Sequence, residues 1–468
     1  MLSLVETSML RSFCLEPRVC RHSARLRRLQ PALHRLYDGI ARDIDFVSSV
    51  LGPAARHCAW SAHELEVHRR LVPAAEGKPT LLLPNSVYLQ SDAAPPDDDF
   101  VLTVGNVQAG EPYQLQLVHD FQRAEHGERV EAGPLHAVCA ALAAAARLVH
   151  PTGTTCVAIL AKRLDILALR TRIDVRGVGE RLRCEHGVDR ILYVSIDDLA
   201  EATVDPTTRD LCVGPHRVSV VYVRYDFSHP FGGHVASSDA RMHTGDAAHA
   251  LRREWSAVEM METSRAVISS SLGSRLAHRR RMQHAMVREV CSPLSHFLST
   301  PDAAAVARVL PEQWALGPDA SESERIAAAA RIASAPEDYV AKSALRPRTG
   351  SGATQDRRAT GGTSVETASG LCALLASPAA AWFLLYPKVR SVVHDASIVH
   401  AGEVHQLSNA ATSEVAVFGA YLTAPPADGG EVLINEAAGL GVRTRPADRS
   451  HPLAAGLGYG ALSCAAKA

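Results

Sequence analysis

Apolar residues recur at three- and four-residue spacing through several long stretches of the chain. In the stretch 29–72, one helical face would carry Leu36, Ile40, Ile44 and Val47. The same kind of pattern predicts an alanine-rich helix over 135–149 and a helix over 365–375. A long helical region is predicted over 247–286, with an interruption around 269–273.

Short apolar runs between turn residues predict strands. The strongest run is 218–227 (VSVVYVRYDF), and shorter buried strands are predicted over 156–160 and 190–194. Residues 100–107 and 113–121 are predicted to pair as a hairpin. The remaining predicted strands are 80–89, 338–342, 382–389, 414–422 and 431–434. Because strands alternate with helices, the pattern indicates an α/β fold.

A loop rich in glycine, serine, threonine and arginine follows the strand that ends on Lys342. Glycines let a backbone bend closely over phosphates, and backbone amides or cations then contact the anion. The loop, 343–363, lacks the Gly-Lys-Ser/Thr ending of a Walker A motif. Taken alone, the loop is equally typical of an exposed surface loop. Whether it is expected to bind phosphate depends on the segments around it.

Composition narrows the classes of function. The chain has 468 residues, 47% of them hydrophobic, and a formal net charge of −1, so it lacks the basic excess of a nucleic-acid-binding protein. The ten cysteines include no C-x-x-C pair, which favours reduced thiols in a cytoplasmic compartment. No apolar run is long enough to span a membrane.

Two basic clusters leave alternatives open. Arg279, Arg280 and Arg281 are predicted either to lie on a solvated helix face or to bind an anion. The first 28 residues are predicted to be an exposed basic helix or, alternatively, an organellar presequence. Arginines are frequent there: Arg11, Arg18, Arg21, Arg25, Arg27 and Arg28.

Five segments in one order resemble the eukaryotic-type glutathione synthetases. They are ETSRAVISSSLGSRLAHRRRMQH (262–284), VVYVRYDFSHP, YVAK with RRATGGTS, SEVAVFGAYL, and the C-terminal EVLINEAAGLGVRTRPADRSHPLAAG. The resemblance covers residues 30 to 468, and the Gly-rich loop gains an insertion of several residues. Read within this order, the loop after Lys342 resembles the family's cover over ATP.

The resemblance implies an ATP-grasp fold with N-terminal helices and an adjacent α/β substrate-binding domain. It divides the chain into a basic segment (1–28), the N-terminal part of the ATP-grasp-like body (29–150), the substrate-binding domain (151–255) and the C-terminal ATP-grasp region (256–468). The implied reaction phosphorylates the carboxylate of γ-glutamylcysteine with ATP, and the amine of glycine then attacks the acyl phosphate. Magnesium, a homodimer and a cytoplasmic location are implied as well.

The resemblance also assigns roles to single residues, each of which has a surface ion pair as its alternative. The expected ATP-binding residues are Arg280 or Arg281, Lys342, Gly361, Gly362, Glu414 and Arg445. The expected residues for γ-glutamylcysteine are Arg224, Arg443, Ala454 and Ala455. Guanidinium groups bind carboxylates in a two-pronged geometry. Arg443 and Lys342 are the residues expected to act in catalysis.

The metal-binding positions depart from the family pattern. The family holds Mg²⁺ with a Glu-x-Asn pair on a strand and a Glu in the Gly-rich loop. Aligned with QLQLVHDFQRAEHG and the loop, these positions become Leu117, His119 and Ala359. Leucine and alanine offer no ligand, so no metal-binding residue is assigned. Weaker stand-ins are Asp120, Asp356, Glu366 and Glu436; further departures from the family are Asn85, Arg163 and Phe227.

Three hypotheses follow from the sequence. The first is an ATP-dependent ligase that joins γ-glutamylcysteine to glycine. The second is a non-catalytic homologue that keeps the fold and binds nucleotide or pairs with an active subunit. The third is an ATP-grasp ligase that uses another amine.

Overall fold

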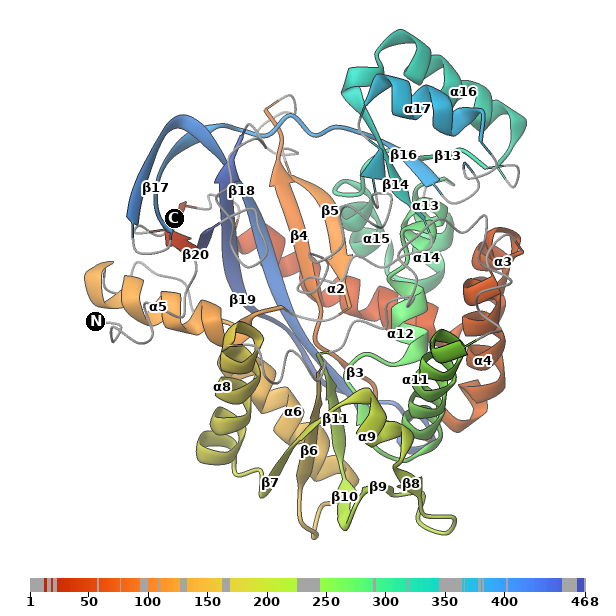
Figure 1. The fold of residues 1–468 in the computed structure, drawn as a ribbon, viewed down its shortest axis with the longest axis vertical. Helices are drawn as coiled ribbons and strands as arrows, with labels where there is room; N and C mark the ends of the chain where they lie inside the picture. The colour runs from red at the N-terminus through yellow and green to blue at the C-terminus, as the bar shows by residue number, and fades with distance from the viewer. Residues whose placement is uncertain are drawn as a thin grey trace.

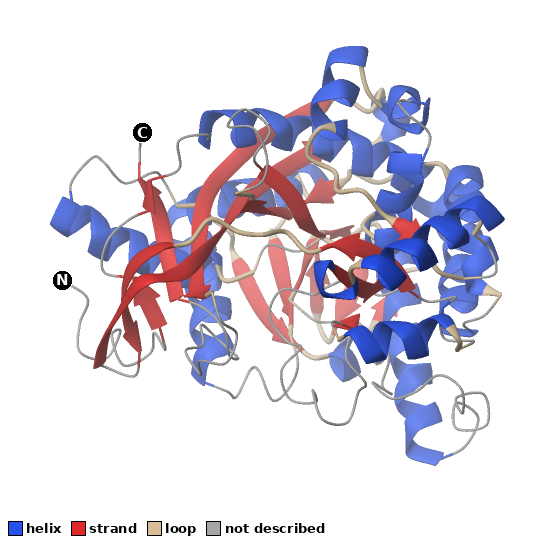
Figure 2. Cartoon of the chain, turned by 90° about the horizontal axis from the view of Figure 1, so that it is seen from above, coloured by secondary structure: helices blue, strands red, loops and turns tan. Residues whose placement is uncertain are grey.

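Four sheets organise the described part of the chain, and helices surround them (Figures 1 and 2). None of the helices in that part is both long enough and apolar enough to cross a membrane. The computed structural model describes residues 12–14, 18–19, 23–56, 59–75, 77–92, 100–107, 110–126, 133–161, 169–224, 245–288, 292–317, 320–344, 364–365, 367–377, 380, 383–400, 403–447 and 461–466.

The largest sheet is centred on two long antiparallel strands, β18 (Glu403–Thr423) and β19 (Val432–Pro446). The turn between them uses Gly429 (φ 90°) and Gly430 (φ 63°), a conformation that glycine adopts without steric cost. Beyond β18 the sheet continues through β4 (Asn85–Gln90) and β5 (Phe100–Asn106). Its other strands are β1 (Ser12–Cys14), β2 (Arg18–Val19), β3 (Leu81–Leu82), β17 (His394–His400) and β20 (Ala461–Ala466).

Helix α2 (Ser23–Arg42) packs against this sheet and supplies much of the core. Leu29, Leu33 and Leu36 recur at helical spacing and are at most 5% exposed. The predicted helices over 29–72 and 247–286 are confirmed. The interruption in the second region runs over 264–271 and contains the short strand β12, so it begins earlier than the predicted 269–273. The helices of this layer are α3 (Ile44–Ala55), α4 (Ala59–Ala75), α11 (Gly245–Thr263), α12 (Leu272–Ala277), α13 (Arg280–Arg288), α14 (Ser292–Phe297) and α15 (Thr300–Ala307).

A second sheet is fully parallel and confirms the α/β character of the fold. Its order is β12 (Val267–Ile268), β11 (Val220–Val223), β6 (Cys156–Leu160) and β7 (Arg190–Val194). Helices α6 (Leu135–Val149), α8 (Leu169–His186) and α9 (Ile196–Ala200) accompany it. A small antiparallel sheet lies beside it, formed by β8 (Thr203–Val204), β9 (Leu211–Val213) and β10 (His216–Val218).

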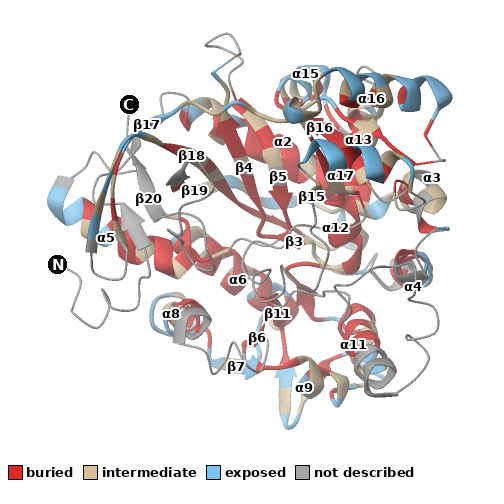
Figure 3. Cartoon of the chain, turned by 45° about the horizontal axis from the view of Figure 1, so that its top comes forward, coloured by how far each residue is buried: buried red, intermediate tan, exposed pale blue. Residues whose placement is uncertain are grey.

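The fourth sheet carries the strand that ends near Lys342. Its order is β13 (Trp314–Ala315), β16 (Phe383–Pro387), β14 (Tyr339–Ser343) and β15 (Ser364–Val365). Helices α16 (Glu322–Ser334) and α17 (Ala368–Leu375) pack on it, and much of their outer surface is exposed (Figure 3). Two short 3₁₀ turns complete the described elements, Pro336–Asp338 and Pro426–Asp428.

The predicted hairpin between 100–107 and 113–121 is wrong. Residues 113–121 belong to helix α5 (Pro112–His126), and β5 pairs with β4 instead. Alternation of Gln and Leu at 114–117 resembles a strand, but the buried positions Leu115, Val118 and Gln122 have helical spacing. Pro112 also suits the first turn of a helix, where its missing N–H costs nothing.

The predicted exposed helix at the N-terminus is also wrong for the residues that the structure describes there. Strands β1 and β2 pair with β17 and β20 in the large sheet, and α2 begins only at Ser23. Pairing of backbone groups within the sheet outweighs the local preference for a helix. The division of the chain into domains stays a prediction.

Candidate functional site

Lys342 lies near the end of β14, between two neighbouring strands. It pairs with Leu384 of β16 on one side and Ser364 of β15 on the other. Its Nζ atom is 4.9 Å from the centre of the Tyr386 ring, a distance at which an ammonium group is attracted to the ring face. Burial raises the pKa of Tyr386, so its hydroxyl stays protonated.

Helix α13 brings two arginines to the same strand end. Arg280 donates from Nη1 to the carbonyl oxygen of Ser343 at 2.8 Å, and the backbone N–H of Arg281 donates to Ala344 at 3.2 Å. Arg280 is also close enough to Tyr386 to lower its pKa in part. The structure therefore brings the side chains of Lys342 and Arg280, two of the residues expected to contact nucleotide phosphates, close to Tyr386, while Arg281 is anchored beside them through its backbone N–H.

The arginine cluster is not a solvated helix face. Arg279, Arg280 and Arg281 are 5%, 8% and 5% exposed. Arg279 forms an ion pair with Glu64 of α4, so its role is to hold the helices together. Buried cations need such partners, because an uncompensated charge in the interior is costly. Of the three, Arg280 and Arg281 are the ones attached to β14.

A second group forms around Arg224, which follows β11. Its Nη2 lies 2.8 Å from Oδ2 of Asp174 on α8, and the two side chains are 3% and 1% exposed. The other carboxylate oxygen of Asp174 accepts from the backbone N–H groups of Tyr113 (2.8 Å) and Gln114 (3.3 Å), at the start of α5. Arg224 is therefore bound to an internal acid that also caps a helix.

Arg443 approaches this group from β19. Its Nη2 is 3.8 Å from Oε2 of Glu111, a residue with φ 60° directly before α5. Burial, with a smaller contribution from Glu111, holds the pKa of Asp174 above its ordinary value although Arg224 opposes this shift. The charges of Arg224 and Arg443 are thus both faced by internal carboxylates, and a substrate carboxylate would have to compete with them.

Glu414 lies beside Arg443 in the large sheet. The two residues are register partners of β18 and β19, and Leu89 of β4 is the partner of Glu414 on its other side. Thr412 and Arg445 pair two residues further along, although the Arg445 side chain is outside the described residues. Gly361, Gly362, Ala454 and Ala455 lie outside them as well, as do Ala359, Asp356, Glu366, Arg163 and Phe227.

The segment predicted to be the metal-binding strand is a helix. Leu117 and His119 lie on helix α5, where Leu117 packs in an apolar cluster and Nδ1 of His119 is 3.2 Å from Asp120. The strand that pairs with β4 is β5, whose last residues are Val104, Gly105 and Asn106. If the family's Glu-x-Asn pattern is compared with these three residues, the asparagine is present and valine stands in place of the glutamate.

Asn106, the last residue of β5, is the register partner of Asn85, the first residue of β4. Their Oδ1 atoms are buried, and within the described part of the chain neither has a hydrogen-bond partner. Amide oxygens suit Mg²⁺, but β5 carries no carboxylate, so these residues do not make the family's ligand pair. The cations around Tyr386 do fit a nucleotide phosphate.

Sequence reasoning missed three contributors to these groups: Glu111, Asp174 and Tyr386. Asp174 lies 50 residues from Arg224 in the chain, in a segment without a recognisable motif. Tyr386 stands in the apolar strand FLLYP, where an aromatic residue reads as core. Only the pairing of strands and the packing of α5 on α8 reveal these neighbours.

The fold is a mixed α/β fold of the glutathione synthetase-like kind. A glutathione synthetase-like effector from Globodera pallida, solved in its apo form, superposes with a TM-score of 0.63 at 15% identity, over 98% of this chain and 90% of that one. A protein described as a γ-glutamylcysteine synthetase from Methylobacillus flagellatus aligns over 90% and 86% of the two chains, with 11% identity and a TM-score of 0.40. Neither a family model nor a curated protein matches the sequence.

Proposed function

We propose that this protein binds ATP and acts as a ligase of the glutathione synthetase kind, joining the carboxylate of γ-glutamylcysteine to the amine of glycine. The observation that carries the proposal is the grouping of the Lys342 and Arg280 side chains at the end of β14, with the backbone of Arg281 anchored beside them. Cations converging on one strand end can neutralise the charge of a nucleotide triphosphate. The glutathione synthetase-like fold gives this grouping its context.

Binding of ATP is the first prediction to test. We expect Lys342→Ala to weaken ATP binding by at least about tenfold, because a charge-assisted hydrogen bond contributes roughly 1.5–3 kcal/mol. Lys388→Ala is the matched control, since Lys388 directly follows β16 of the same sheet and donates from Nζ to the carbonyl oxygen of Glu337 instead. Titration calorimetry of both variants measures the change. Equal affinities in wild type and Lys342→Ala would contradict the proposal.

Turnover is tested separately. Purified protein with ATP, Mg²⁺, γ-glutamylcysteine and glycine should release ADP, and Lys342→Ala should not. Release with another amine, but not with glycine, would identify a ligase for a different acceptor. This assay separates the reaction from the binding of ATP.

A non-catalytic, nucleotide-binding homologue is the second candidate function. Two observations favour it: Arg224 is held by Asp174, and β5 lacks a carboxylate beside Asn106. A protein that binds ATP tightly, yet releases no ADP with γ-glutamylcysteine and glycine or other amines, would support this candidate.

A further inference from the structure

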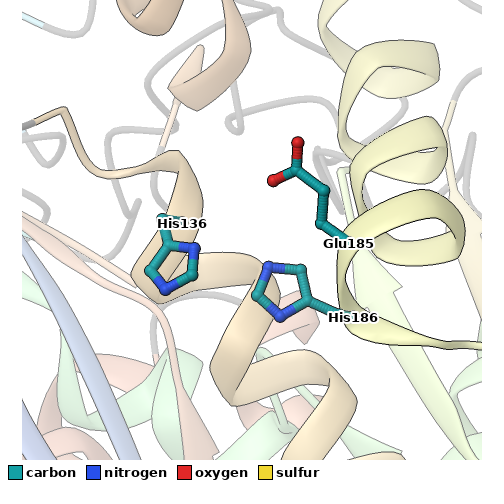
Figure 4. Close-up of side chains that lie close together, drawn as sticks. All are labelled: His136, Glu185 and His186. Atoms are coloured by element: carbon teal, nitrogen blue, oxygen red, sulfur yellow. The ribbon is translucent and has the colours of Figure 1, made fainter.

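Three potential metal ligands meet where the start of α6 approaches the end of α8. His136 is in the first turn of α6, and Glu185 and His186 are the last two residues of α8. One ligand atom from each lies within 4.8 Å of the other two. Figure 4 shows the two imidazole rings facing each other, with the Glu185 carboxylate beside them. We call these three residues the His136–His186 cluster.

The packing of α6 on α8 fixes this meeting point. Cys139, one turn after His136, is buried, and its Sγ lies 3.9 Å from the carbonyl oxygen of Val178 on α8. Arg147 of α6 donates to the carbonyl oxygen of His186 at 3.1 Å. The centres of the His136 and His186 rings are 5.0 Å apart. The cluster therefore joins two helices whose relative position is set independently by the core.

We propose that the His136–His186 cluster binds a divalent transition metal ion of the zinc type. Two imidazoles and one carboxylate are a common set of three protein ligands for zinc, with a fourth position left for water. Within the described residues, the Nε2 atom of His186 is buried without a hydrogen-bond partner, so it can accept a metal at no loss of other contacts. Metal binding would clamp the end of α8 to α6.

Binding of a zinc ion would require only small movements of the three side chains. Ligand atoms that surround a tetrahedral zinc ion at about 2.0–2.1 Å lie roughly 3.4 Å from each other. The separations here are at most 4.8 Å, and both His136 and Glu185 are exposed, so their side chains can move by the remaining distance. The carbonyl groups at the end of α8 also favour a cation.

Two cations near the cluster oppose metal binding. Arg181 forms an i,i+4 ion pair with Glu185, and Arg147 is bonded to the backbone of His186. An exposed ion pair contributes little, so Glu185 can leave Arg181 for a doubly charged ion. Because Arg147 and Arg181 remain near the bound ion, we expect micromolar rather than nanomolar affinity for zinc.

This site is distinct from the proposed nucleotide and substrate groups. Asp174, the partner of Arg224, lies on the same helix, twelve residues before His186, which is about 18 Å along the helix axis. Loss of ATP binding in Lys342→Ala should therefore leave metal binding intact. The inference stands whether or not the protein is a ligase.

The test uses the full chain without a polyhistidine tag and Zn²⁺ as the only probe. Titration calorimetry should show one site, and His136→Ala or Glu185→Gln should each weaken it by at least about tenfold. His216→Ala, a histidine of β10 outside the cluster, should bind as wild type does. Co²⁺ in place of Zn²⁺ should give visible absorption bands that disappear in His136→Ala.

Two results would overturn the proposal. One is unchanged zinc affinity in His136→Ala and Glu185→Gln, which would assign the binding to other histidines among the 22 in the chain. The other is absence of saturable zinc binding by the wild-type protein. Both variants change exposed side chains, so their thermal unfolding without metal should match wild type and exclude misfolding as the cause.

Discussion

Arg224 and Asp174 bury two opposite charges beside the first turn of α5. Their side chains are nearly inaccessible, and Asp174 also accepts two backbone N–H groups of that helix. The family resemblance assigns Arg224 to a substrate carboxylate, whereas its position makes it a partner of an internal carboxylate. Binding a substrate carboxylate and pairing with Asp174 both require a positive charge at this position, so an arginine here can serve in either role.

Removing the charge of Asp174 while Arg224 remains should destabilise the folded protein. We expect Asp174→Asn to lower the free energy of unfolding by about 3–5 kcal/mol, because Arg224 then remains charged, buried and short of a partner. Asp338→Asn is the control, since Asp338 pairs with Arg390 in the open and such pairs contribute at most about 1 kcal/mol. Urea unfolding of the two variants gives both values. Similar values would show that the buried pair is not a stabilising contact.

The candidate site was predictable in part from single residues. Lys342 and either Arg280 or Arg281 were expected near phosphate, and the structure places Lys342 and Arg280 close to Tyr386. The acids opposite Arg224 and Arg443 were not predictable, because they come from α8 and from the residue before α5, far away along the chain. A residue's type indicates what it can bind, and only its neighbours determine what it does bind.

Helix α5 shows why an element can be misread. Its sequence alternates polar and apolar residues for four positions, and such a short alternation also fits about one turn of a helix. The contacts that select the helix are non-local: Asp174 caps its first turn, and Tyr113 packs on Gly177 of α8. Strands β6 and β7 were predicted correctly; for β6 the reason is that an apolar run buried in a parallel sheet needs little from distant residues.

The contact between α5 and α8 depends on a glycine. A Cβ atom at Gly177 would lie 2.2 Å from the Tyr113 ring, so Gly177→Ala must displace the ring or the helix. We expect a loss of about 1–3 kcal/mol in the free energy of unfolding. The measurement is thermal or urea unfolding.

Gly179 provides the control two residues further on. A Cβ atom there would meet the hydroxyl end of Tyr193 at 2.4 Å, but Tyr193 is 39% exposed and can turn toward solvent. Alanine is also the better helix former by about 1 kcal/mol. Gly179→Ala should therefore be nearly neutral. If both variants lose equal stability, the close packing of Tyr113 on α8 is not the cause.

Three buried histidines join the N-terminal helices to the rest of the molecule. His34 of α2 lies 2.8 Å from Oδ1 of Asn435 on β19, and His278, after α12, stacks on Tyr37 with ring centres 3.7 Å apart. His68 of α4 is buried beside Gly273. Burial lowers the pKa of each histidine to about 4, so all three are neutral in the folded protein at pH 7.

These histidines make the stability of the whole molecule sensitive to acid. Above pH 6.5 they are neutral in both the folded and the unfolded state, so they do not lower the free energy of unfolding. Between pH 6.5 and 4 only the unfolded chain binds the protons, so stability falls as the pH falls. At pH 5 each histidine should cost about 2 kcal/mol, since one pKa unit corresponds to about 1.4 kcal/mol.

The slope of stability against pH isolates this effect from the carboxylates. Three protons give a slope of about 4 kcal/mol per pH unit between pH 5 and 6, and His68→Gln should reduce it by about 1.4 kcal/mol per unit. Urea unfolding at intervals of half a pH unit measures both slopes, and His216→Gln should leave the slope as in wild type. An unchanged slope in His68→Gln would mean that His68 accepts its proton within the folded protein. The contact between α4 and α12 would then open before the molecule unfolds.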